Sequence, residues 1–238
     1  MDLITFLTNK MPRTKKFVER TFPFIGKTMN ARRERMRVEA YKAYGMETAR
    51  QFNACMTECG YRYMLIGGTM LGAIREHGFI KHDMDLDVSM WIDEYSPKMI
   101  DDLKRYGFEW LYSYQIAEGK YGREDTFDYK GCRIDIFYIY PAIDKLPYIT
   151  DYWNEPGMAP GTYMPRRQEM PFVRETRMEK FEDMMLPVPA NAEEQCIFRY
   201  GEDYMTPNPR WDNHKKAGCI LDWEEMVGQT RHLTYPKL

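Results

Sequence analysis

The spacing of apolar side chains predicts one long helix near the start of the chain. From about Asn30 to Cys59, apolar positions recur every three to four residues, the period of a helix with one buried face. Asn30 is a candidate N-cap, and Gly60 is placed to end the helix. The preceding residues, 1–29, are interrupted by prolines and a glycine, so short helical pieces are expected there.

Shorter elements follow, and several show the two-residue alternation of half-buried strands. Strands are expected at 61–66, 84–90, 108–114, 126–130 and 133–140, and helices at 70–76, 97–106 and 192–200. Residues 141–180 are rich in proline, glycine and aromatic residues, which favours a long connection over the surface. The expected fold class is α/β (α+β): a mixed sheet flanked by helices, with a basic helical N-terminal segment and an irregular C-terminal half.

Composition narrows the class of protein. The chain has 238 residues, of which 44% are hydrophobic, enough to build a core and to exclude a mainly disordered chain. The longest apolar run, Ile136–Ile143, is too short for a membrane span, and no signal-peptide pattern is found. Five cysteines without a CxxC pair fit a reducing compartment. A soluble, cytoplasmic protein is therefore expected.

Charge is distributed unevenly along the chain. Residues 1–42 carry a net charge of +7, whereas the remainder carries −9. Apolar side chains lie among these basic residues, so the segment suits peripheral contact with an anionic membrane, from the cytoplasmic side. A solvated basic helix face is the alternative interpretation. No nucleic-acid partner is expected, because the body of the chain is acidic.

Three aspartates are the candidate catalytic and metal-binding residues. Asp85 and Asp87 project from one face of a predicted strand, and two carboxylates held that close need a counter-cation. Hard oxygen ligands favour Mg²⁺ or Mn²⁺. Asp135 lies in a later, otherwise apolar strand and joins the same site if the two strands are neighbours. Taken alone, Asp135 is equally compatible with an exposed strand face.

A glycine turn precedes these acids and suits a phosphate group. Gly67, Gly68 and Thr69 stand where a strand leads into a helix, so the backbone can approach a ligand closely. The free N–H groups of a helix N-terminus bind phosphate oxygens. A glycine turn followed by a strand bearing Asp-x-Asp is typical of a nucleotidyltransferase-type active site.

The same residues resemble the signature of the LicD family, which comprises bacterial phosphocholine transferases and fukutin-type enzymes. The motif stretches are Gly67–Ile80, Asp83–Val88, Arg133–Phe137, Leu186–Pro189 and Tyr200–Pro207, and the resemblance runs from roughly Tyr41 to Pro209. The family usually has Pro-Trp before its acids, whereas this chain has Lys81-His82. The Asp-x-Asp pair itself is kept, so the departure bears on the donor rather than on the metal.

The resemblance implies a nucleotidyltransferase-like fold and a metal-dependent transfer of a substituted phosphate to a sugar hydroxyl. It implies phosphocholine from CDP-choline as the transferred group, with CMP released, and a glycan or its lipid-linked precursor as acceptor. The metal ligands map onto Asp85 and Asp87, with Asp135 as the third acid or the general base. Donor contacts are expected from Gly67, Gly68, Thr69 and Arg75.

The implied organisation is a basic amphipathic segment at 1–29, a LicD-like catalytic domain at 30–209 and a C-terminal extension at 210–238. Two other functions share the same residues. One is an NTP-dependent nucleotidyltransferase that modifies a small molecule, RNA or protein and releases pyrophosphate. The other is a non-catalytic, membrane-associated adaptor, against which the retained acids speak. Aromatic residues that could surround a choline group are abundant, but the sequence does not place them around one.

Overall fold

The computed structural model describes residues 23–81, 85–153, 158–159, 161–208, 220–223 and 228–231. Most of the predicted basic segment, His82 and the Asp83-Met84 pair lie outside the described residues. The helices are α3 (Pro23–Cys59), α4 (Gly67–Glu76), α5 (Lys98–Arg105) and α6 (Ala192–Tyr200), with 3₁₀ turns η1 (Ile92–Glu94) and η2 (Ala117–Gly119). The strands are β1 (Met64–Leu65), β2 (Asp85–Trp91), β3 (Glu109–Ile116), β4 (Gly122–Tyr129), β5 (Cys132–Ile139), β6 (Tyr148–Trp153), β7 (Thr162–Glu169), β8 (Thr176–Phe181), β9 (Met184–Pro189), β10 (Ile220–Asp222) and β11 (Gly228–Arg231).

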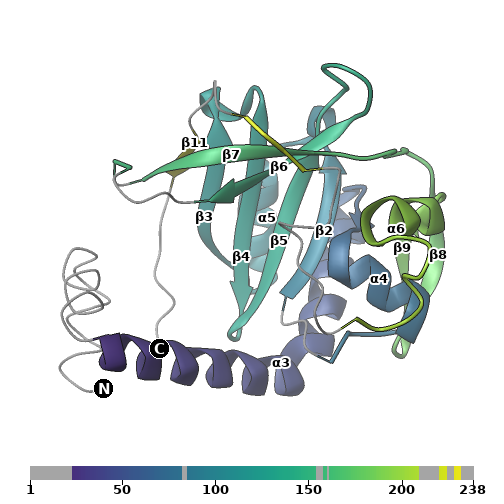
Figure 1. Cartoon of the computed structure of the whole chain (residues 1–238). Coiled ribbons are helices and arrows are strands. Elements are labelled where there is room, and N and C mark those ends of the chain that lie inside the picture. Colours follow the sequence, from purple (N-terminus) through teal and green to yellow (C-terminus); the bar gives the residue numbers. More distant parts are fainter. Residues whose placement is uncertain are drawn as a thin grey trace.

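The strands form a mixed sheet in the order β1-β2-β5-β4-β3-β11-β7-β10, with β6 paired to β7, and a separate hairpin of β8 and β9. Strands β2 and β5 are parallel, while β4 is antiparallel to both β5 and β3. Figure 1 shows β6 and β7 crossing in front of the sheet, with α5 behind it. The predicted mixed sheet with flanking helices is therefore confirmed.

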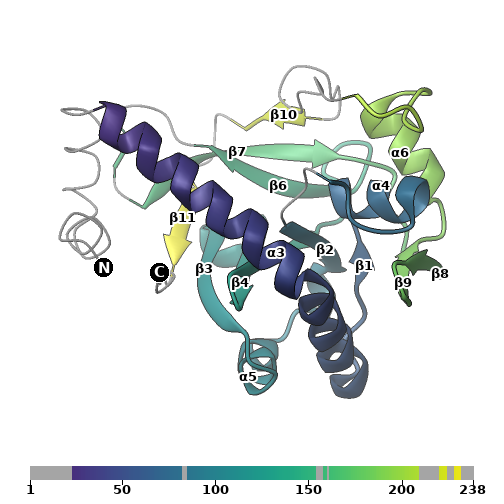
Figure 2. The ribbon, with the colours of Figure 1, turned by 90° about the horizontal axis from the view of Figure 1, so that it is seen from below.

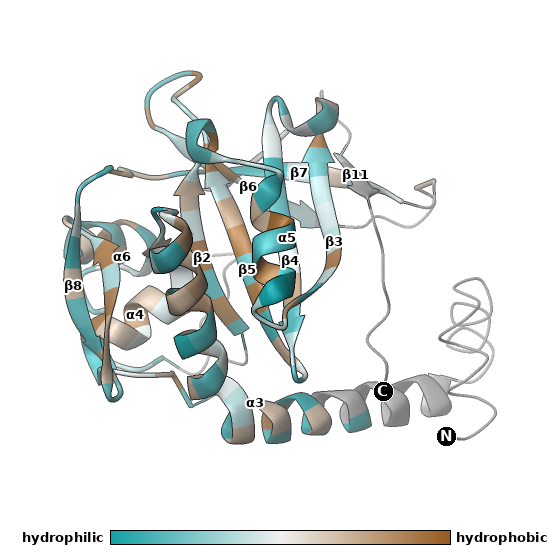
Figure 3. Ribbon diagram, turned by 180° about the vertical axis from the view of Figure 1, so that it is seen from behind, coloured by the Kyte–Doolittle hydropathy of each residue, from teal (hydrophilic) through white to brown (hydrophobic). Residues whose placement is uncertain are grey.

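Alternate residues of the central strands build the core. Leu86, Val88, Ile134 and Ile136 point to the face covered by helices and are at most 2% exposed. This face packs against the C-terminal part of α3, whose Phe52 belongs to the same hydrophobic core. The view from behind shows α5 lying over the same side of the sheet (Figure 3). The opposite face of β2 and β5 is left to carry the polar residues of the site.

The long helix ends at Cys59 as predicted, but the predicted start at Asn30 is wrong. Helix α3 begins at Pro23 and passes through Gly26 without a break. Proline fits the first turn of a helix because the N–H it lacks has no partner there. Figure 2 shows α3 as one continuous helix that bends partway along its length. It therefore crosses the boundary expected between residues 29 and 30.

The connection expected at 141–180 contains regular structure, so that prediction is wrong. Strands β6, β7 and β8 lie there, and β9 follows. Proline and glycine content concealed them, yet Pro165 is a residue of β7, paired with Tyr152 of β6. Further along, β10 pairs with β7, and β11 pairs with both β3 and β7. Two strands of the stretch 210–238 thus belong to the main sheet.

Among the described residues, no helix is both long enough and apolar enough to cross a membrane. Helix α3 is long but carries many charged residues, and the other described helices are short.

Candidate active site

Parallel pairing of β2 with β5 brings the three predicted aspartates together. Asp87 and Asp135 are direct partners in the register, and Asp85 lies two residues earlier on the same face of β2. One carboxylate oxygen from each residue lies within 4.8 Å of the others, and all three side chains are half-buried. Within the described ranges, no other set of three Asp, Glu, His or Cys side chains comes so close. The convergence expected from neighbouring strands is thus present.

Two hydrogen bonds connect the start of α4 to the backbone of Asp87. The Ile66 N–H donates to the Asp87 carbonyl (3.1 Å), and the Asp87 N–H donates to Thr69 Oγ1 (2.9 Å). Gly67 has φ +60°, and a Cβ at this position would stand 3.2 Å from Asp87 Oδ2. No side chain caps α4, so the N–H groups of its first turn begin beside the acids. Gly67, Gly68 and Thr69 therefore lie at the site, with Thr69 buried and holding Asp87.

Strand β4 adds two polar residues that the sequence did not single out. Thr126 is the register partner of Asp135 and donates its hydroxyl to Asp135 Oδ1 (2.5 Å). Glu124 lies two residues earlier on the same face and is 8% exposed. Burial, with Asp135, Asp151 and Asp87 nearby, raises the pKa of Glu124 well above its usual range. The site thus holds a fourth carboxylate beside the three aspartates.

Burial also raises the pKa of Asp135, to about 6. The hydrogen bond from Thr126 lowers this pKa, because it favours the charged form, while the charge of Asp85 raises it. Arg133 and Arg37 lower it further by their positive charge. Arg37 comes from α3, and its guanidinium lies 3.8 Å from the Asp85 carboxylate. Two arginines thus stand next to the acids, where an anionic ligand would meet them.

Arg75 lies apart from these residues. It sits eight residues after Gly67, about 12 Å along the axis of α4. Its guanidinium donates to the Glu76 carboxylate and to the Tyr204 carbonyl, and its side chain is 10% exposed. These contacts tie α4 to the segment after α6. The predicted contact of Arg75 with the donor stays a prediction.

Glu124 was missed because the predicted strand began too late, at residue 126, whereas Thr126 lay within that strand and was not singled out. A signal for them exists in the two-residue turn Lys130-Gly131, where both residues have positive φ. Such a turn fixes the register of a hairpin and places Thr126 opposite Asp135. Arg37 had no comparable signal, because its position depends on how a long helix packs.

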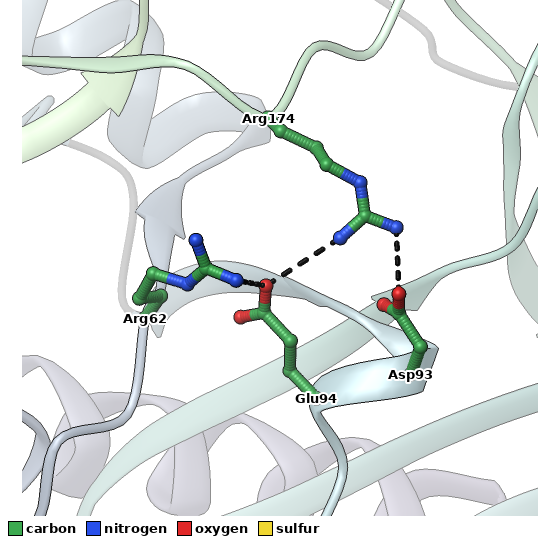
Figure 4. Close-up of polar contacts among 4 residues, drawn as sticks. All are labelled: Arg62, Asp93, Glu94 and Arg174. Carbon is green, nitrogen blue, oxygen red and sulfur yellow. Dashed lines mark hydrogen bonds and ion pairs between the residues drawn. The ribbon is translucent and has the colours of Figure 1, made fainter.

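A cavity of about 230 Å³ lies at the other end of β2 and is distinct from the acid site. Trp91, on its wall, is four residues beyond Asp87, about 13 Å along an extended strand. Arg62 and Arg174 both pair with Glu94, and Arg174 also pairs with Asp93 at 2.8 Å (Figure 4). Because these charges neutralise one another, the cavity offers no excess positive charge to a diphosphate.

The acid site suits a divalent cation. Its donor set consists of carboxylate oxygens from three residues on two adjacent strands, which are the ligands that Mg²⁺ and Mn²⁺ prefer. Three carboxylates whose oxygens lie within 4.8 Å of one another repel one another unless a cation or protons compensate their charge. The residues present therefore fit a hard metal ion.

Residues 60–191 match a protein-family model described as LicD/FKTN/FKRP, nucleotidyltransferase domain. The chain is also similar to two mammalian proteins named ribitol-5-phosphate transferase FKTN. The protein from Mus musculus is 25% identical over 182 residues, and that from Macaca fascicularis is 23% identical over 186. Each alignment covers 72% of this chain but 37% of the relative. The chain thus spans little more than a third of the curated relatives it matches.

Proposed function

Because the chain belongs to the LicD family, whose domain covers more than half of it, we propose that it transfers phosphocholine from CDP-choline to a sugar hydroxyl. The family suggests, at a coarser level, transfer of a phosphate-bearing substituent onto a glycan. The single observation that carries the proposal is the meeting of Asp85, Asp87 and Asp135 at the start of α4. The acceptor proposed is a glycan unit or its lipid-linked precursor.

Asp85, Asp87 and Asp135 would hold the divalent cation, Mg²⁺ or Mn²⁺. When bound, such an ion neutralises charge on a diphosphate and on the departing nucleotide. The first-turn N–H groups of α4 bind phosphate oxygens, and Gly67 lets the phosphate approach because no Cβ stands in the way. Arg37 and Arg133 add positive charge on the side of Asp85 and Asp135. The chain's own groups thus position the donor's diphosphate.

In the proposed reaction the sugar oxygen forms a bond to the phosphorus that carries choline. The bond from that phosphorus to the CMP oxygen breaks, and CMP leaves. The hydroxyl proton passes to a carboxylate, for which Asp135 is placed, with Thr126 holding one of its oxygens. Asp135 either accepts this proton or completes the metal shell. Positioning and charge neutralisation supply most of the catalysis in such transfers.

Calorimetric titration of CDP-choline into the protein tests the proposal. With Mg²⁺ present, binding is expected, and it should disappear with EDTA or in the Asp85→Ala/Asp87→Ala variant. CTP serves as the comparison, because an NTP-dependent nucleotidyltransferase binds it in preference to CDP-choline. Tight binding of CTP with none of CDP-choline would contradict the proposal. Binding of neither would favour the non-catalytic adaptor.

We further propose that residues 1–42 hold the protein at the cytoplasmic face of an anionic membrane, where a lipid-linked acceptor would be reached. The support is their net charge of +7 and the apolar residues among the basic ones. Sedimentation with vesicles tests this. We expect binding to vesicles containing phosphatidylglycerol, none to pure phosphatidylcholine vesicles, and release in high salt. Equal binding to both vesicle types, or to neither, would contradict it.

A further inference from the structure

Four tyrosines gather beside the aspartates. Tyr112 and Tyr114 come from β3, Tyr152 from β6 and Tyr163 from β7. The ring of Tyr114 is central, with centroid distances of 4.9 Å to Tyr112, 4.8 Å to Tyr152 and 4.7 Å to Tyr163. Strands β6 and β7 bring the last two across the front of the sheet (Figure 1). A continuous aromatic wall thus lies on the polar side of the molecule.

The strand register places this wall on the face of the aspartates. Tyr112 is the partner of Thr126, which is in turn the partner of Asp135. Tyr114 is the partner of Glu124. Because partners in register share a face, Glu124 lies beside Tyr114 on the same face as Thr126 and Asp135, with Phe137 as its partner on β5. From Thr126 to Glu124 the step along the strand is about 7 Å.

Glu124 is buried among other carboxylates. It is 8% exposed, and the charged groups that act on it most strongly are Asp135, Asp151, Asp87 and Asp125. The neighbouring Arg123 does not compensate it, since its guanidinium is bound to Asp125, at 2.7 Å from Nε. A carboxylate buried among like charges is costly. A cationic group from a ligand would remove this cost.

The chemistry of the wall selects among cations. An ammonium or guanidinium group needs several hydrogen-bond acceptors, whereas a quaternary ammonium has no N–H and is bound by aromatic faces and negative charge. Tyrosine rings beside a carboxylate supply both. Only two carbons and an oxygen separate the nitrogen of choline from its phosphorus. Tyr112 and Asp135 lie on either side of Thr126, about 10 Å apart across two strand spacings, so one donor can span the aspartates and the wall.

We infer that Glu124 and the tyrosines Tyr112, Tyr114, Tyr152 and Tyr163 form the subsite that binds the quaternary ammonium head group of the donor proposed above. The inference rests on the proposed transfer from a CDP-linked donor. It assigns to the tyrosine faces and to Glu124 the selection of choline over an uncharged polyol.

Variants at Glu124 and Tyr114 test the inference by calorimetry with Mg²⁺, using CDP-choline, CDP-ribitol and CDP as ligands. Glu124→Gln should weaken the binding of CDP-choline at least tenfold and leave the binding of CDP unchanged. Tyr114→Phe keeps the aromatic face and should stay within about twofold of the wild type, whereas Tyr114→Leu should weaken CDP-choline about fivefold or more. Glu109→Gln, at an exposed position on β3, serves as the matched control and should change nothing.

The outcomes separate this inference from the proposed function. Tighter binding of CDP-ribitol, with Tyr114→Phe as harmful as Tyr114→Leu, would show recognition of hydroxyl groups and overturn the inference alone. Equal binding of CDP and CDP-choline would overturn it as well. Failure of every CDP compound to bind would overturn the proposed function itself. The melting temperature of Glu124→Gln should match or exceed that of the wild type, because a buried ionisable group among other carboxylates is replaced by an amide of the same shape, so lost binding cannot be ascribed to misfolding.

Discussion

Asp135 experiences two opposing influences that set its protonation. Burial and the nearby Asp85 raise its pKa to about 6, whereas the Thr126 hydroxyl and two arginines favour the charged form. At neutral pH the carboxylate is therefore mostly ionised but less stable than it would be in water. A carboxylate in this state gains from a cation, which is the physical reason for expecting a metal ion here.

Asp135→Asn should stabilise the metal-free protein at neutral pH. The folded-state pKa of about 6 lies above the unfolded value of 3.8, so the contribution of Asp135 to stability falls as pH rises through this interval and stays low above it. Removing the charge should raise the free energy of unfolding by up to about 3 kcal/mol at pH 7.5 with EDTA, and by much less near pH 4. Chemical denaturation at both pH values measures this.

The control for this prediction is Asp101→Asn, at a side chain that is 78% exposed. It should change stability little at either pH. A loss of stability on Asp135→Asn at pH 7.5 would contradict the description of Asp135 as a strained carboxylate.

Gly67 carries a second prediction at the scale of single residues. Gly67→Ala meets the cost of positive φ and also pushes on Asp87 Oδ2, which lies 3.2 Å from the new Cβ. Gly60→Ala meets only the first cost, since Gly60 has φ +76° and nothing within 4 Å. Each should lose about 1 kcal/mol of stability from the positive φ; Gly67→Ala should lose more than this, and only Gly67→Ala should lose Mg²⁺-dependent CDP-choline binding. Equal binding by the two variants would mean that Asp87 tolerates the displacement.

Among the elements, the β4–β5 hairpin does most to assemble the site. Its turn at Lys130-Gly131 fixes which residues of β4 face Asp135, and a slip of one residue would turn Thr126 and Glu124 to the other face. Parallel pairing of β2 and β5 then aligns Asp87 with Asp135. Two registers, one local and one long-range, therefore decide the positions of all the carboxylates.

Helix α3 contributes Arg37, which lies outside the residues that match the family model. Arg37→Ala should cost less than about 1 kcal/mol of stability, because both partners of its ion pair with Asp85 are about a third exposed. If Arg37 contacts the diphosphate, Arg37→Ala should weaken the binding of CDP-choline several-fold, and more strongly at low salt. Arg50→Ala on the same helix is the control, since Arg50 pairs with Asp183 on the surface. Identical affinities of the two variants would remove Arg37 from the site.

The elements differ in how well the sequence predicts them. Alternation predicted β2 and β5 and with them the three aspartates, because a half-buried strand imposes its pattern locally. The end of α3 was predictable from Gly60, but its start was not, since proline is compatible with a first helical turn. Strands β6 and β7 carry no clear alternation, and β7 also pairs with the distant strands β10 and β11. Glu124 and the tyrosine wall became recognisable only once those pairings were known.

At the scale of the whole molecule, the site joins segments that are far apart in the chain. The acids come from β2 and β5, the glycine turn from α4, one arginine from α3 and the tyrosines from β3, β6 and β7. Strand β11 links β3 to β7 and closes this arrangement near the C-terminus. Ligand binding at such a site stabilises the fold as a unit.

Mg²⁺ should therefore raise the melting temperature of the wild-type protein. Binding only to the native state adds RT ln(1 + [L]/Kd), which is about 2.7 kcal/mol at a hundredfold excess over Kd. Asp87→Asn removes one ligand and should abolish most of the shift. Differential scanning calorimetry with Mg²⁺ and with EDTA measures it. An equal shift in the variant would place the binding of Mg²⁺ elsewhere.

The measurement that tests the central claim most directly is the identification of the nucleotide product. Wild-type protein incubated with Mg²⁺, CDP-choline and a mixture of cellular glycolipids should release CMP, measured by ion-exchange chromatography. The Asp85→Ala/Asp87→Ala variant should release none. Release of pyrophosphate from CTP, with CDP-choline left intact, would contradict the account, because it would show attack on a different phosphorus.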